Sequence, residues 1–189
     1  MLIAIDSSLS LAVMVILPLY VPSGFKWLAS LLGFKGDRKL GKEYILRASS
    51  VPNLTQTDAL YMLYYIAAKT EHDYAQALVY MQQLNTRFPN NIVFKCRNAE
   101  MLYRNNRVPE SRVAFTLFID QCNALGDECN KRDAFLAYYF LTKGYLEENN
   151  IGMAKLYYGP AVINDQHEHK KATADLEKWK EQLGGTSKN

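Results

Sequence analysis

The sequence predicts an all-α fold, a right-handed solenoid of helical hairpins with a hydrophobic N-terminal helix and a polar C-terminal capping helix. The first observation behind this prediction is a repeated pattern, in which a turn precedes a small residue and that residue opens an amphipathic helix. The small residues are Gly41, Ala77, Ser111 and Ala154. Their separations are 36, 34 and 43 residues, and a repeat of roughly 20–50 residues is typical of stacked helical units.

The second observation is a composition that fits one ordinary globular domain. The chain has 189 residues, of which 49% are apolar and 22% charged, so intrinsic disorder is excluded. A net charge of +3 is too small to argue for DNA or RNA, and we expect no nucleic-acid partner. Aromatic residues reach 12%, which indicates a tightly packed helical protein that makes contacts.

The first element is apolar. Leu11 to Val21 reads LAVMVILPLYV and contains Pro18. This run is shorter than the ~20 apolar residues that a membrane-spanning helix needs. No basic segment precedes it and no small-residue cleavage site follows, so the pattern is not that of a signal peptide. We expect residues 1–35 to form hydrophobic helices that pack on the array, with a membrane-associated hairpin as the minority alternative.

The helical hairpins are predicted over residues 36–165. The clearest one runs from Asp58, turns at residues 72–74, places Ala77 in its second helix and stops at Pro89, because proline cannot donate the backbone hydrogen bond. The next begins at Ile92 and has Pro109 in the first turn of its second helix, where a missing N–H costs nothing.

The last hairpin pairs AFLAYYFLTKGYLEE with GMAKLYYGPAV, after the longer linker CNALGDECN. A polar helix from about Glu168 to Gln182 follows and is closed by Gly184-Gly185. We expect residues 166–189 to be a capping helix and tail, because the end of a solenoid needs a polar outer face.

The hairpin from Asp58 to Asn91 resembles a tetratricopeptide repeat, and the 34-residue separation is the period of that family. Tyr65 stands where the family usually has a small residue, and Met81 stands where it usually has an aromatic one. Leu17-Pro18 followed by Gly33-Phe34-Lys35-Gly36-Asp37 is similar to tetratricopeptide proteins of the Iml-two type and their bacterial relatives. The resemblance implies a helical-repeat fold and carries no catalytic residues.

Three cysteines, Cys96, Cys122 and Cys129, form no C-x-x-C pair. An odd number is unlike a disulfide framework, so we expect reduced structural thiols and a cytoplasmic protein. The alternative is a Cys122–Cys129 bridge across a helix-linking turn, which would imply an oxidising compartment, periplasmic or secreted. Peripheral attachment to a membrane is a further alternative.

Catalytic motifs are missing from the sequence. It has no G-x-S-x-G, no H-E-x-x-H and no phosphate-binding glycine loop, so we expect no enzyme activity and no cofactor. His167 and His169 are two positions apart, which does not place them on one helical face, and we expect no metal site there.

The predicted function is that of a non-enzymatic interaction module, an adaptor or scaffold that binds a protein or an acidic peptide through the concave helical face. Aromatic rings beside Lys and Arg heads suit such a ligand. The candidate partner-binding residues are Lys69, Arg97, Glu100, Tyr103, Arg104, Tyr139 and Lys143. For any one tyrosine the competing interpretation is burial between helices. The alternative function is a structural subunit that joins its own copies end to end through the apolar region 11–32.

Overall fold

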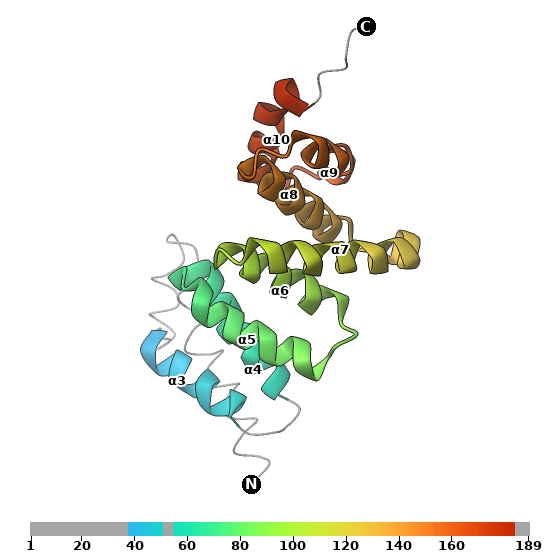
Figure 1. Cartoon of the computed structure of the whole chain (residues 1–189). Coiled ribbons are helices and arrows are strands. Elements are labelled where there is room, and N and C mark those ends of the chain that lie inside the picture. The colour runs from blue at the N-terminus through green and yellow to red at the C-terminus, as the bar shows by residue number, and fades with distance from the viewer. Residues whose placement is uncertain (1–37, 51–54, 184–189) are drawn as a thin grey trace, which may run out of the picture. The chain divides into compact units, whose positions relative to one another are not determined.

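The computed structural model describes residues 38–50 and 55–183, and every regular element in these ranges is helical (Figure 1). The chain divides into two compact units, residues 1–84 and 85–189. The helices of the first unit are α3 (Arg38–Ser49), α4 (Gln56–Tyr65), the π-helix η3 (Ile66–Glu71) and α5 (Tyr74–Arg87), whose last three residues lie beyond the boundary. Those of the second are α6 (Ile92–Arg104), α7 (Val108–Leu125), the 3-10 helix η4 (Gly126–Glu128), α8 (Lys131–Glu147), α9 (Ile151–Asn164) and α10 (Lys170–Leu183).

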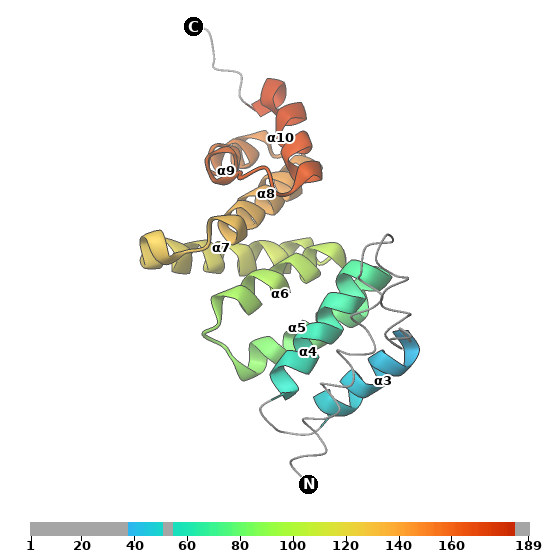
Figure 2. The ribbon, with the colours of Figure 1, turned by 180° about the vertical axis from the view of Figure 1, so that it is seen from behind.

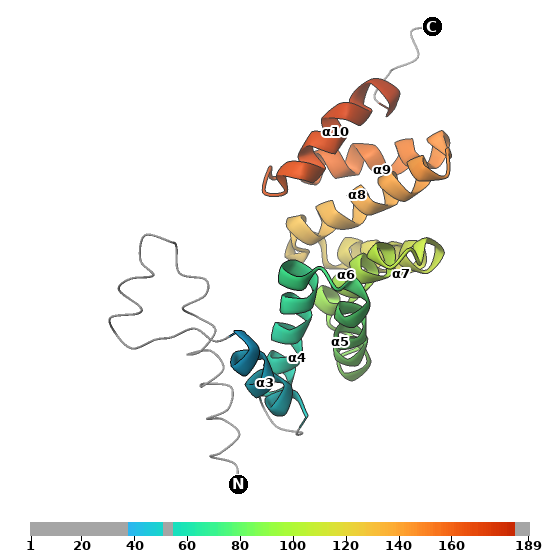
Figure 3. The same ribbon diagram turned by 90° about the vertical axis from the view of Figure 1, so that its left-hand side faces the viewer.

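In the first unit, α3 packs on α4 (Figure 3). Ile45 and Ala48 of α3 are buried, as are Leu63 and Tyr64 of α4, so each helix turns one apolar face inward. On the exposed side, the Lys42 ammonium lies 2.7 Å from a Glu71 carboxylate oxygen and links α3 to η3. The predicted hydrophobic helices of residues 1–35 lie outside the described residues, as does the Gly33–Asp37 turn.

The second unit consists of two helical hairpins and a further helix. Helix α6 packs on α7, α8 on α9, and α10 on α9 (Figures 1 and 2). Its core is aromatic: the rings of Phe115 and Phe140 stack with centroids 5.6 Å apart, and Phe118 and Phe135 are also buried. A helix is present where the capping helix is predicted: α10 starts two residues later than expected and buries Leu176.

The same junction recurs between the two helices of successive pairs. His72, Asn106 and Asn149 adopt the left-handed conformation, with φ of 56°, 60° and 56°. The junctions after α6 and α8 also share a backbone hydrogen bond that spans five residues, from Arg107 N–H to the Leu102 carbonyl (3.0 Å) and from Asn150 N–H to the Tyr145 carbonyl (2.8 Å).

Five residues after each left-handed position lies one of the small residues that the sequence predicts. Ala77 and Ala154 are fully buried and Ser111 is 1% exposed. Ser111 also donates its hydroxyl to the Ala99 carbonyl of the partner helix at 2.8 Å. The spacing of 34 and 43 residues therefore marks helix–turn–helix junctions, and the small residue after each of them is buried.

Asparagine side chains begin three helices of the second unit. Asn91 caps α6 by accepting from Phe94 N–H, Asn130 caps α8 by accepting from Arg132 N–H, and Asn150 caps α9 in the same manner. Such a side chain satisfies one of the N–H groups that have no intrahelical acceptor. Each helix start is therefore specified locally, by a residue that is visible in the sequence.

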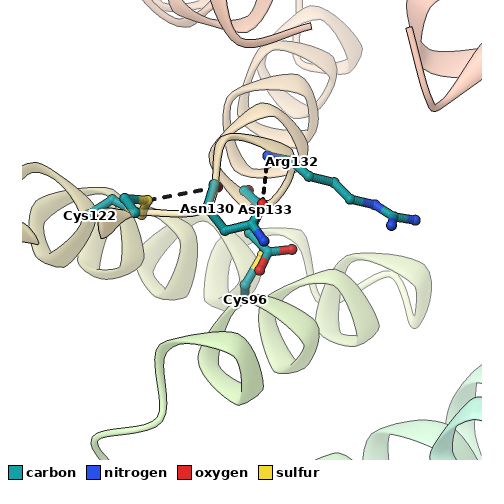
Figure 4. The surroundings of a disulfide bond; sticks show 6 residues. Cys96, Cys122, Asn130, Arg132 and Asp133 are labelled. Carbon is teal, nitrogen blue, oxygen red and sulfur yellow. Dashed lines mark hydrogen bonds between the residues drawn. A yellow bond between two sulfur atoms is a disulfide. The ribbon is translucent and has the colours of Figure 1, made fainter. Parts of the chain in front are cut away.

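Cys122 and Cys129 form a disulfide across η4 (Figure 4). The expectation of reduced thiols is therefore wrong for this pair, and the alternative bridge is the one observed. The reason is that α7 ends at Leu125 and is followed by Gly126, where a φ of 57° turns the chain back. The two cysteine Cα atoms then lie 5.0 Å apart. Cys96 is free and fully buried in α6.

Candidate functional site

A cavity of about 330 Å³ opens in the second unit, where three helices converge. Arg104 at the end of α6 contributes to the lining, as do His169, just before α10, and residues 170–172 in the first turn of α10. The middle of α8 forms the remaining wall with Leu136, Tyr139, Phe140 and Lys143. Four of the nine lining residues carry a positive charge at neutral pH and none is acidic. The cavity is thus an aromatic-walled pocket with a cationic rim.

The aromatic wall is held rigidly. The Tyr139 ring is 5% exposed, stacks on Trp179 of α10 at 5.5 Å and donates its hydroxyl to Asp175 at 2.8 Å. Burial, with the hydrogen bond to Asp175, raises the pKa of Tyr139. Tyr139 therefore remains a neutral phenol that ties α8 to α10. Phe140 meets it edge-on at 5.1 Å.

Two of the cations are positioned by neighbouring rings and carboxylates. The Arg104 guanidinium lies over Phe140 at 5.6 Å and donates from Nε to Glu100 at 2.9 Å. The Lys143 ammonium lies over Tyr103 at 5.3 Å and 3.8 Å from a Glu147 oxygen. Cation–π contacts of this kind restrict the side chain without neutralising its charge. Each of the two cations is therefore held in place by one aromatic ring and one carboxylate.

The other two cations come from the start of α10. The turn before the helix is built by Asp165, whose carboxylate accepts from His167 N–H (2.8 Å) and from the Thr173 hydroxyl (3.1 Å). Lys170 and Lys171 follow in the first helical turn, and both are exposed. Within residues 38–50 and 55–183, neither lysine has a carboxylate within ion-pair distance.

His169 forms the edge of the cavity nearest α8. Its ring stacks on Phe135 with centroids 5.7 Å apart, and its Nε2 accepts a hydrogen bond from Arg132 Nε at 3.2 Å. An accepting nitrogen must have its lone pair available, so this ring is neutral. Burial, and then the positive charges of Arg132 and Arg97, lower the pKa of His169.

A buried ionic network lies between α6 and α8. Arg97 pairs with Asp133 of α8 and lies 3.5 Å from a Glu100 oxygen, while Arg104 holds the other oxygen of Glu100. Glu100 is only 2% exposed. Removing one partner of such a network leaves an uncompensated buried charge, so the loss of any one of these groups is costly, and the Arg97–Asp133 pair joins α6 to α8.

The seven predicted residues therefore divide into three groups. Arg104, Tyr139 and Lys143 line the cavity. Tyr103 contacts Lys143 through its ring and donates its hydroxyl to Glu147. Arg97 and Glu100 belong to the buried network, so the expectation that they present their charges on an open face is wrong. Their burial follows from the packing of α8 against α6. Lys69 lies in η3, in the other unit.

Sequence reasoning missed His169, Lys170 and Lys171 as members of the site. The signal that could have found them is the adjacent basic pair at a predicted helix start, where N–H groups and positive charge gather.

For metals, no group of three or more His, Cys, Asp or Glu side chains suited to an ion occurs among the described residues. The buried Cys96 thiol has its pKa raised by desolvation.

In the parts of the chain that the structure describes, no helix has the length and apolarity needed to span a bilayer. Comparison with known proteins gives no match: neither a protein family, nor a curated protein, nor a solved structure is similar to this chain. The resemblance to tetratricopeptide repeats therefore stays a prediction from sequence.

Proposed function

We propose that the chain is a non-enzymatic protein-interaction module that binds an acidic peptide segment through the cavity between α6, α8 and α10. The observation that carries the proposal is the lining: four cations, two aromatic rings and no carboxylate. Aromatic and arginine side chains are the groups most often responsible for affinity at protein interfaces. An acidic segment with an apolar neighbour would meet both components.

We further propose that the helical hairpins form a tetratricopeptide-like solenoid. The recurring left-handed residue, followed after five positions by a buried small residue, supports this arrangement. Helix–turn–helix units of this kind bury their apolar faces only by stacking on a neighbour. In such a stack the first helix of each pair faces inward, in agreement with the contribution of α6 and α8 to the cavity.

For the compartment, the disulfide favours the periplasmic or secreted alternative over the cytoplasmic prediction. Disulfides persist in oxidising environments, and cytosolic thiols are kept reduced. Cys122 is mostly buried in the second unit, so its bridge is part of the folded structure.

The test is a peptide-binding measurement on the full chain by fluorescence anisotropy. The Lys143→Gln variant removes one cation from the rim, and we expect it to weaken binding of a glutamate-rich peptide about tenfold, because a charge-assisted contact is lost. Lys143 is preferable to Arg97 or Arg104, since their loss would strand Glu100 in the interior.

Lys155→Gln is the matched control, because Lys155 is exposed on α9 and does not line the cavity. It should bind the peptide as the unchanged protein does. Equal weakening by both variants, or equal binding of a lysine-rich peptide, would contradict the proposal.

A further inference from the structure

The cavity is lined by four positive charges, more than one carboxylate of a ligand would neutralise. Arg104 and Lys143 each have a carboxylate nearby, from Glu100 and Glu147. Lys170 and Lys171 have no such neighbour in the described parts of the chain. Two positive charges at the start of α10 thus have no neighbouring carboxylate, and they match a group that carries about two negative charges.

The donors on that side are also several and close together. The two lysines are consecutive in the first turn of α10, and the amide N–H groups of residues 170–172 have no acceptor among the described residues. The positive end of the helix dipole adds to the attraction for an anion. A phosphoryl group at neutral pH carries a charge of roughly −1.5 to −2 and three strong acceptor oxygens, which suits this set of donors better than a carboxylate does.

The volume argues that the group is attached to a larger molecule. A cavity of about 330 Å³ corresponds to roughly ten waters at about 30 Å³ each, which is more than one inorganic phosphate fills. Leu136, Tyr139 and Phe140 give the remaining space an apolar wall. A phosphorylated side chain, with the neighbouring residues of its peptide, would occupy both parts.

We propose that the cavity between α6, α8 and α10 recognises a phosphoryl group on a side chain of the bound peptide. This inference rests on the proposed function and names the ligand group at the same site. The two lysines of α10 contact the phosphoryl oxygens, Arg104 and Lys143 add charge from α6 and α8, and the aromatic wall contacts the peptide next to the modified residue.

The experiment compares three peptides of one acidic sequence, with alanine, glutamate or phosphoserine at the central position. Anisotropy of the labelled peptides, measured on the full chain at constant salt, gives the three dissociation constants. We expect phosphoserine to bind about tenfold more tightly than glutamate, since it adds charge-assisted hydrogen bonds. Inorganic phosphate alone should compete only at much higher concentration.

Single substitutions in α10 test whether its lysines are responsible for the preference for phosphoserine. Lys170→Gln and Lys171→Gln should each reduce the preference for phosphoserine over glutamate. Lys180→Gln removes an equal charge from the same helix, is exposed and does not line the cavity, so it should leave the preference unchanged. Circular dichroism confirms that each variant retains its helices.

Three results would overturn the inference. If phosphoserine binds no better than glutamate while glutamate still exceeds alanine, the proposed function stands and the phosphoryl preference is wrong. If the three peptides bind equally and Lys143→Gln has no effect, both are wrong. If inorganic phosphate binds as tightly as the phosphopeptide, a ligand carried on a peptide is wrong.

Discussion

Arg97 and Arg104 lie seven residues apart on α6, but their guanidinium groups lie in different environments. Arg97 has a side chain that is 15% exposed and is committed to Asp133 on the neighbouring helix. Arg104 reaches the cavity and lies over an aromatic ring. The helical period predicts that both residues share a face. It cannot predict which one the next helix covers, because that depends on where α8 crosses α6.

His169 should make the stability of the chain depend on pH. Its pKa is lowered in the folded protein, so as pH falls the unfolded chain takes up this proton first, near the ordinary pKa of about 6.5. Burial is the largest cause of the lowered pKa; the positive charges of Arg132 and Arg97 lower it further, and the carboxylates of Glu100 and Glu168 oppose them. We expect the His169 contribution to be intact above pH 7, to begin to fall as pH drops below about 6.5, and to be lost as pH falls through the lower pKa of the folded protein.

Urea unfolding at pH 7.5 and 5.5 checks this expectation. The unchanged protein should lose more free energy of unfolding between the two pH values than His169→Phe, which retains a ring to stack on Phe135 and does not titrate. His167→Phe serves as the control, because His167 is largely exposed. An identical pH dependence for all three proteins would rule out a His169 contribution.

At the scale of elements, the sequence predicts best those features that depend on a single residue, such as a small side chain at a junction between two helices. Ala77, Ser111 and Ala154 were predicted as positions of close helix approach, and each is buried at its junction. The π-helix Ile66–Glu71, in which Ile66 and Ala67 are buried, is not predicted by the sequence, because apolar periodicity does not distinguish it from the end of an α-helix. The expectation of reduced thiols is wrong for Cys122 and Cys129, because a spacing of seven residues is compatible with either redox state and does not show that the chain folds back between them.

Enlarging one of these small residues should destabilise its hairpin. Ala154→Leu adds three carbon atoms at a fully buried position in α9, where α8 packs closely. We expect the free energy of unfolding to fall by about 1–3 kcal/mol, the usual cost of overpacking. Chemical denaturation of the full chain measures it.

Ala174→Leu is the comparison, because Ala174 is exposed on α10. Its free energy of unfolding should stay close to that of the unchanged chain. A neutral result for Ala154→Leu would mean that the helices at this junction can separate without penalty, and the repeat interpretation would lose its physical basis.

At the scale of the whole molecule, the all-α fold was predictable and the candidate site only in part. Periodicity orients each helix about its own axis, but it does not give the rotation of one hairpin relative to the next. The convergence of Arg104, Lys143 and the start of α10 depends on that rotation, so the two lysines of α10 were missed. A uniform repeat predicts Lys69 on the same face as Arg104 and Lys143, but Lys69 lies in the other compact unit.

Association is the property that separates the interaction module from the end-to-end structural subunit. The apolar region 11–32 that motivates the second function lies outside the described residues. A binding module that acts alone predicts a mass of 21.6 kDa at every protein concentration. Light scattering over a concentration series measures this mass, and a steady increase with concentration would favour self-assembly.

The pairing of Cys122 with Cys129, together with the complete burial of Cys96, leaves the native chain without an accessible sulfhydryl. A maleimide dye can then attach only after the second unit has opened. Engineered surface cysteines would therefore accept labels selectively in the intact protein, which gives single-molecule and spin-label work a background free of native thiols.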